Sequence, residues 1–170
     1  MDSLHDAITT FGCGERPHES ELVVWDGFDQ LEKEDAGQFF SGKTWRDVLS
    51  HLRGLKDEPV FGGAYFLEEW TVLSPSPLAY YARAYLEYLR ETLASGQPDE
   101  EFVFYFLGAL YQVAHMGSPF DPAQTDFLRR VVQQTAETAA ASGSFEYFAD
   151  DIKHQAERFL MSSEIGRAHV

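Results

Sequence analysis

Four helix starts, spaced about evenly along the second half of the chain, constrain its fold more than any other feature. Ser76-Pro77, Asp99, Asp121-Pro122 and Ser144 each place a capping side chain, in two cases with a proline after it, before a run rich in apolar residues. Each run repeats its apolar residues every three or four positions, the spacing of one face of an α-helix. The connections are short, so neighbouring helices should pack antiparallel. We therefore expect a compact all-α bundle.

The first half of the chain carries weaker helix signals and one strand signal. Helices are expected over residues 2–10, 28–40 and 64–70, and a better one follows Thr44, because Asp47 three residues later resembles a capping box. The apolar face of that better helix comprises Trp45, Val48, Leu49 and Leu52. Leu22–Trp25, followed by the turn pair Asp26-Gly27, is the only plausible strand, and a lone strand cannot form a sheet. The sequence thus predicts about five to seven helices and at most one minor strand near Leu22–Trp25.

The helix that follows Ser76-Pro77 contains a dense group of tyrosines. Tyr81, Tyr85 and Leu89 are spaced four residues apart, so they trace one face that should be buried, and Leu78, Ala82 and Leu93 widen that face. The opposite face is expected to carry Arg83, Glu87, Arg90 and Glu91. Tyrosine clusters form either core or binding surface, and a surface for interaction could comprise Tyr80, Tyr88, Trp25, Asp26 and Asp29. The next helix is apolar on all sides over Phe102–Leu107, as a central buried helix would be.

The charge of the chain excludes one class of partner. It has 28 acidic residues against 13 lysines and arginines, a formal net charge of -15. Such a surface repels nucleic acid, whose phosphates require clusters of basic side chains. The same surface favours solubility and attracts basic partners. We expect no nucleic-acid partner and consider a basic protein the best match.

The compartment follows from the absence of targeting signals. Cys13 is the only cysteine, which rules out an internal disulfide and fits a reducing environment. The N-terminus has neither the basic start nor the apolar run of a signal peptide, and Phe102–Leu107, the longest apolar run, is too short to span a bilayer. We expect a cytoplasmic protein with no membrane partner.

A single domain is expected over residues 1–164, since the length fits one domain and neither a repeat nor a low-complexity linker interrupts the chain. Residues 165–170, Ile-Gly-Arg-Ala-His-Val, resemble the translation of a common sequencing-library adapter. We therefore expect the native chain to be interrupted near Glu164, with the last six residues foreign to the fold.

No arrangement of residues in the sequence predicts a catalytic or cofactor site. Asp151 and His154 are three residues apart and are weak metal-ligand candidates, but helical di-metal sites need Glu-x-x-His pairs from two helices. Cys13 with His18 could suggest a thiol nucleophile, yet the neighbouring acidic residues would raise the pKa of the thiol. We therefore expect no cofactor and no metal, and not an enzyme.

One tract resembles a known family. Leu73–Leu86, which reads Leu-Ser-Pro-Ser-Pro-Leu-Ala-Tyr-Tyr-Ala-Arg-Ala-Tyr-Leu, resembles the tract Leu-Thr-Pro-Glu-Ala-Phe-Arg-Tyr-Tyr-Leu-Pro-Ala-Tyr-Leu of a family of bacterial domains of unknown function. Phe40–Trp45 resembles the family's Phe-x-Gly-x-x-Trp element, and the similarity covers Phe28–Val113. This chain has Ala82-Arg83 in place of Leu-Pro, so it lacks the proline that would kink the helix. The resemblance implies no established activity.

Two functional hypotheses remain. The first is an acidic interaction protein of the bacterial cytoplasm, specifically an immunity or inhibitor protein that occludes a basic toxin, which it matches in size and charge by analogy only. The alternative is a metal-dependent or other small helical enzyme built in the helical core.

Overall fold

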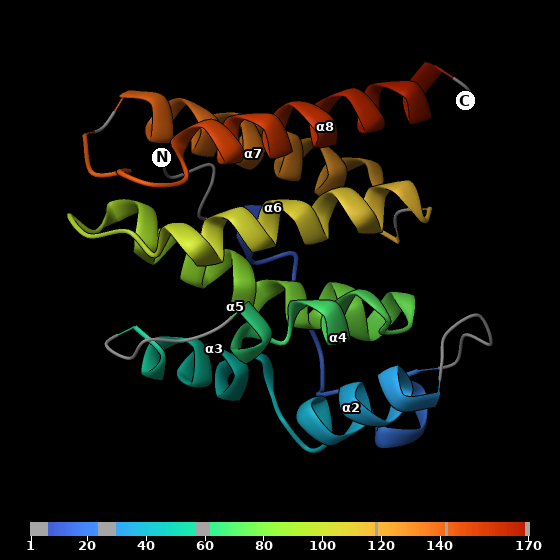
Figure 1. Ribbon diagram of the computed structural model, residues 1–170. Coiled ribbons are helices and arrows are strands. Elements are labelled where there is room, and N and C mark those ends of the chain that lie inside the picture. The colour runs from blue at the N-terminus through green and yellow to red at the C-terminus, as the bar shows by residue number, and fades with distance from the viewer. Residues whose placement is uncertain (1–6, 24–29, 57–61, 118, 142, 169–170) are drawn as a thin grey trace. The chain divides into compact units, whose positions relative to one another are not determined.

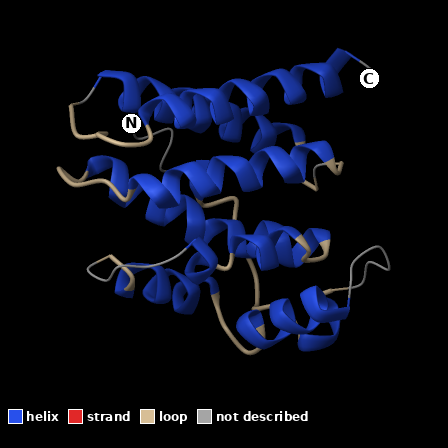
Figure 2. Ribbon diagram, viewed as in Figure 1, coloured by secondary structure: helices blue, strands red, loops and turns tan. Residues whose placement is uncertain are grey.

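The computed structural model describes residues 7–23, 30–56, 62–117, 119–141 and 143–168 (Figure 1). In these residues the chain forms seven α-helices and two short 3-10 helices, joined by loops and turns, with no strand (Figure 2). The all-α prediction and the expected number of helices are confirmed. The chain divides into two compact units, one ending at Tyr88 and the other beginning at Leu89.

The first unit contains short helices and most of a long one. Its elements are η1 (Glu19–Glu21), α2 (Gln30–Phe40), α3 (Trp45–Gly54), η2 (Gly62–Tyr65), α4 (Leu67–Thr71) and the part of α5 (Pro75–Ala94) up to Tyr88. The second unit contains the rest of α5 with α6 (Glu100–His115), α7 (Pro122–Ala141) and α8 (Ala149–Ala168).

The structure forms no strand at Leu22 and Val23, the described part of the candidate strand, which agrees with the expectation of at most one. Glu21 closes η1, and its carboxylate accepts a hydrogen bond from the backbone N–H of His18, which caps that helix. Leu22 is buried, and its carbonyl accepts the N–H of Ser74 at 2.8 Å, a contact between two loops with no strand partner. Trp25 and the turn after it lie outside the described residues.

Helix α3 begins as its sequence predicts. The Thr44 hydroxyl accepts the N–H of Asp47, and the Asp47 carboxylate accepts the N–H of Thr44 at 2.9 Å, so the capping box is confirmed with Asp in place of Glu. The hydrogen bond from the Thr44 backbone is the largest cause that lowers the pKa of Asp47. The predicted apolar face is buried at Trp45, Val48, Leu49 and Leu52.

Helix α5 begins one proline earlier than expected. Ser74 precedes the first helical residue, Pro75, and its carbonyl accepts the N–H of Leu78 at 2.9 Å. Pro75 and Pro77 therefore both lie in the first turn, where the backbone N–H groups have no partner within the helix and proline is tolerated. The helix ends at Ala94, two residues before Gly96.

The predicted tyrosine face of α5 is core. Tyr81, Tyr85 and Leu89 are buried, and the two phenols donate to backbone carbonyls of other elements. Tyr81 Oη lies 3.0 Å from the Phe40 carbonyl and 2.6 Å from that of Lys43. Burial is the main cause that raises the pKa of both phenols. Each tyrosine therefore fills the core and also gives its phenol a hydrogen-bond partner among the backbone carbonyls of a neighbouring segment.

The opposite side of α5 is not the solvated face that the sequence predicted. Glu87 is only 6% exposed, and its carboxylate pairs with Arg83 one turn earlier. The expectation of an exposed Glu87 is wrong because α5 is covered on nearly every side, and a charge can be buried there only with a partner.

In the second unit, α6 and α7 begin as predicted and α8 begins later. The Asp99 carboxylate caps α6 through the Phe102 N–H at 3.1 Å, and Asp121 caps α7 through the N–H of Gln124 at 2.7 Å. Helix α8 starts at Ala149 rather than Ser144, because the Glu100 carboxylate accepts the N–H groups of residues 147 and 148 and holds that segment as a loop. Val132 belongs to the buried face of α7, whereas Val131 is half-buried.

Helix α8 packs against both α6 and α7, and the three run alternately up and down (Figure 1). Phe102, Val103, Phe106 and Leu107 of α6 are buried, but Tyr105 of the same helix is exposed, so the expectation that this segment is buried on all sides is wrong. Helix α8 continues to Ala168 and so includes residues 165–168 of the expected foreign tail. No helix in the described part of the chain is long and apolar enough to cross a bilayer.

Candidate functional site

The tyrosines proposed as an interaction surface are not available on the surface. Tyr80 is 7% exposed and Tyr88 is 2% exposed. The Tyr80 phenol oxygen accepts the N–H of Trp45 at 3.3 Å, which places it at the first turn of α3 inside the core. Tyr80 and Tyr88 therefore form no exposed surface, whereas Ala79 and Arg83 of the same helix are half-buried. Trp25, Asp26 and Asp29 lie outside the described residues.

The weak metal candidates lie on the exposed side of α8. Asp151 and His154 are exposed, and the Nδ1 atom of His154 lies 3.9 Å from a carboxylate oxygen of Glu157. Within the described ranges, no group of three or more His, Cys, Asp and Glu side chains could hold a metal ion. The structure therefore adds no third ligand to this pair.

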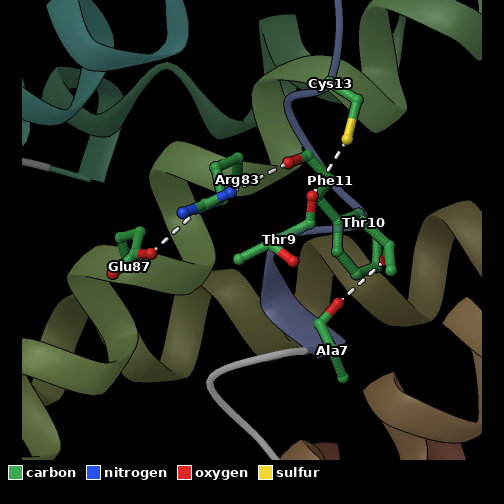
Figure 3. Close-up of polar contacts among 7 residues, drawn as sticks. All are labelled: Ala7, Thr9, Thr10, Phe11, Cys13, Arg83 and Glu87. Carbon is green, nitrogen blue, oxygen red and sulfur yellow. Dashed lines mark hydrogen bonds and ion pairs between the residues drawn. The ribbon is translucent and has the colours of Figure 1, made fainter.

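Cys13 and His18 each make local contacts. The Cys13 thiol is exposed and donates to the Thr9 carbonyl, with 2.9 Å between sulfur and oxygen (Figure 3). The Nδ1 atom of His18 accepts the N–H of Ser20 at 3.3 Å and caps η1. The structure does not bring the two side chains together as nucleophile and base.

The second unit exposes a group of aromatic side chains. Tyr147 is 80% exposed and Tyr105 is 42% exposed. Phe104 contacts aromatic rings of both segments: its ring centroid is 5.3 Å from that of Tyr105 and 5.5 Å from that of Phe148, the residue after Tyr147. We call Phe104, Tyr105, Tyr147 and Phe148 the aromatic surface.

Two hydrogen bonds to one carboxylate hold the backbone of this aromatic surface in place. The Glu100 carboxylate accepts the N–H of Tyr147 at 2.9 Å and of Phe148 at 3.1 Å, which ties the loop before α8 to the first turn of α6. The two segments that form the surface, one in α6 and one before α8, are therefore held together. A backbone held in place before binding reduces the entropy lost when its side chains contact a partner, which favours the use of Tyr147 as an anchor.

Acidic residues surround the aromatic surface. The segments 99–105 and 146–151 that form it contain six acidic residues and no lysine or arginine. Asp99 caps α6 and Glu100 holds the loop, whereas Glu146, Asp150 and Asp151 are exposed and Glu101 is half-buried. Glu101 lies four residues before Tyr105, so the two share a helix face. The surface thus combines apolar rings with a strongly negative rim.

A polar cleft of about 1240 Å³ lies in the first unit. Trp45 forms part of its wall, with the guanidinium carbon of Arg46 4.6 Å and that of Arg83 4.5 Å from the Trp45 ring centre. Arg16 also lines the cleft, as do acidic residues of the same N-terminal segment, Glu15, Glu19 and Glu21. Its hydroxyl-bearing residues are Thr9, Thr10, Ser41, Thr44, Ser76 and Tyr80.

Arg83, which lines this cleft, makes polar contacts with both Phe11 and Glu87 (Figure 3). Its Nε donates to the Glu87 carboxylate at 2.9 Å, and its Nη1 donates to the Phe11 carbonyl at 3.2 Å. Phe11 is fully buried, so Arg83 ties the N-terminal segment to α5. The side chain of Arg83 is 15% exposed, which leaves part of the guanidinium open to the cleft.

Gly12 allows the N-terminal segment to approach this closely. Its φ is +73°, and a Cβ atom placed there would lie 2.8 Å from Arg83 Cβ and 2.8 Å from Trp45 Cδ1. A side chain at this position would therefore collide with the two residues that form the cleft wall, and it would also require an unfavourable backbone conformation.

Sequence reasoning missed both features. The aromatic surface had a usable signal, since residues 99–105 and 146–151 are aromatic and acidic with no base. The cleft had no such signal, because Arg16, Arg46 and Arg83 are far apart in the chain and meet only in the folded unit. Comparison with protein families, with curated proteins and with solved structures finds no match to this chain.

Proposed function

We propose that this chain is an interaction protein that binds a basic segment of another protein through the aromatic surface of its second unit. The observation that carries the proposal is the exposure of Tyr147 and Tyr105 within two segments that contain six acidic residues and no base. A solvent-exposed tyrosine at 80% exposure contributes nothing to the core, so its stability role is small.

Tyrosine is a good anchor for such an interaction. It buries a large area with only two side-chain torsions to fix, and tyrosines are among the residues whose truncation most weakens interfaces. Arginine and lysine side chains of a partner also bind favourably over the face of an aromatic ring. The aromatic surface therefore supplies both apolar contact and attraction for cations.

The acidic residues around the aromatic surface should speed association with a basic partner and disfavour acidic ones. The overall charge of -15 attracts a basic protein from a distance, and the exposed carboxylates of Glu146, Asp150 and Asp151 select against acidic competitors. Binding of this kind weakens as salt increases, because exposed charges are screened within about 10 Å at 0.1 M ionic strength.

The biological class that fits is an immunity or inhibitor protein of the bacterial cytoplasm. A small acidic protein with a fixed aromatic anchor can occlude a basic toxin domain, such as a nuclease, without any catalytic residue of its own. The fit rests on charge, size and the aromatic surface.

The test is co-expression with the product of a neighbouring gene that encodes a basic toxin. We expect this chain to restore growth and to purify with the toxin as a complex, and we expect Tyr147→Ala to lose both properties. Met161→Ala is the matched control, because Met161 is 64% exposed on α8 but twelve residues beyond the start of that helix.

Two outcomes would refute the proposal. One is the absence of any protection or complex with the toxin encoded beside the gene. The other is a complex that Tyr147→Ala and Met161→Ala weaken equally, since that would place the contact elsewhere.

A further inference from the structure

The aromatic surface lies at one end of the seam between α6 and α8. These two helices pack against each other and run in the same direction, because α7 runs the opposite way between them in the sequence (Figure 1). Phe104 of α6 meets Phe148, the residue before α8, where the seam begins. Tyr111 follows Phe104 by seven residues, which is about two turns and a rise of about 10 Å. It therefore lies on the same side of α6, farther along the seam.

Gly108 lies between these two aromatic positions, four residues after Phe104 and three before Tyr111. It has no side chain, and the amide nitrogen of Gln155 in α8 would lie 3.3 Å from a Cβ atom placed there. The two helices approach each other closely at this point, and α6 places no side chain there between the two rings. The aromatic surface and Tyr111 therefore belong to one continuous seam.

The ring of Tyr111 already carries a cation. The guanidinium carbon of Arg158 in α8 lies 4.2 Å from the centre of the Tyr111 ring, and the ring of His115 stacks beside it at 5.9 Å. Arg158 is exposed, and its Nη1 also donates to the side-chain oxygen of Gln155 at 3.4 Å. Because Arg158 itself faces solvent, its removal would open the ring of Tyr111 to solvent.

Arg158 is the nearest internal equivalent of what a basic partner would bring. Residues 100–115, which form α6, contain two glutamates and no lysine or arginine, so the cation on Tyr111 comes from the neighbouring helix. A contact between a cation and an exposed aromatic ring is weak. An arginine of a partner can therefore replace Arg158 on the ring at little cost.

We propose that Tyr111 is a second binding site for an arginine of the partner, and that Arg158 occupies this site when the partner is absent. The inference rests on the proposed function, since it extends the same surface along the seam. The partner segment that fits carries two arginines about 10 Å apart, a distance that an extended chain spans in three residues. Arg158 thus acts as an internal competitor that lowers the affinity for such a segment.

The test is titration of the full chain, followed by fluorescence anisotropy, with two labelled peptides of the same composition. One carries two arginines three positions apart, and the other carries them side by side. We expect Arg158→Ala to strengthen binding of the spaced peptide about two- to fivefold more than Lys153→Ala does, the factor for one exposed cation–ring contact. Lys153 is an exposed cation of the same helix, so its loss changes the net charge equally. The peptide with adjacent arginines should bind both variants with equal affinity.

A double variant shows whether the gain comes from the ring. Tyr111→Leu keeps a large apolar side chain but removes the aromatic face, so it should abolish the gain when combined with Arg158→Ala, and its melting temperature checks the fold. Equal effects of Arg158→Ala and Lys153→Ala on the spaced peptide, or a gain that persists without the ring, would overturn the inference. The proposed function would stand in that case if Tyr147→Ala still weakened binding. Failure of both peptides to bind the unmodified chain would refute the two together.

Discussion

The pair of Arg83 and Glu87 gives the sharpest quantitative prediction, because sequence and structure expect different results from one substitution. If Glu87 were exposed, as the sequence predicts, Glu87→Ala would lower the free energy of unfolding by less than about 0.5 kcal/mol. In the structure Glu87 is 6% exposed and lies 2.9 Å from Arg83 Nε. Glu87→Ala therefore removes the partner of a largely buried charge.

The expected cost follows from the surroundings of Arg83. Removal of one member of a fully buried ion pair costs about 3–5 kcal/mol, because the other charge stays buried without compensation. The Arg83 side chain is 15% exposed at the cleft, so water can reach part of the guanidinium and lower that cost. We expect Glu87→Ala to reduce the free energy of unfolding by about 2–3 kcal/mol. Glu87→Gln keeps an acceptor for Arg83 Nε and should cost about 1 kcal/mol.

Urea denaturation of the full chain measures these values. Glu137→Ala is the control, since Glu137 is an exposed residue of α7 and its loss should change stability by less than about 0.5 kcal/mol. A Glu87→Ala variant as stable as Glu137→Ala would show that the carboxylate is solvated and that the ion pair does not hold the N-terminal segment.

Four other substitutions test the buried tyrosine and the close approach at Gly12. Tyr85→Ala should cost about 3–5 kcal/mol in urea denaturation, as for other buried aromatic rings, and a neutral effect would contradict the core assignment. The pKa values of Tyr81 and Tyr85 are raised by burial, so the stability they contribute is complete below pH 10 and is lost as the pH rises through the folded-state values. Unfolding followed against pH should therefore show a decline above pH 10 that is shallower in Tyr85→Phe, and an unchanged decline would be inconsistent with a buried phenol. Gly12→Ala should cost about 2 kcal/mol or more because of its positive φ and the collision with Arg83 and Trp45, whereas Gly37→Ala, within α2 and with open space around it, should stabilise by up to about 1 kcal/mol. Equal melting temperatures for the two glycine variants would refute the close approach at Gly12.

Local features of the fold were predictable from the sequence. Thr44, Asp99 and Asp121 cap their helices as expected, because a capping side chain reaches only three residues along the chain. The buried tyrosine face of α5 was also predictable, since helical periodicity relates residues four positions apart.

Long-range features were not predictable. The start of α8 depends on Glu100, which is 47 residues from Tyr147 in the sequence. The burial of Glu87 depends on Arg83, whose second partner is the carbonyl of Phe11, 72 residues away. The cleft of the first unit is missed for the same reason, because its lining residues come from distant parts of the chain. The aromatic surface was missed because Tyr147 belongs to no periodic stripe and Tyr105 lies in a helix segment that appeared apolar on all sides.

The most direct test of the proposed function is a nuclear magnetic resonance titration of the isotope-labelled full chain with a short arginine-rich peptide. The account predicts that the backbone signals of Tyr105, Tyr147 and Phe148 shift most, and that Tyr147→Ala weakens binding about tenfold while Met161→Ala does not, since truncation of an anchor tyrosine costs more than 1 kcal/mol. It also predicts that added salt reduces the affinity. Shifts spread evenly over all acidic positions, or centred on the N-terminal segment at residues 15–21, would contradict the central claim.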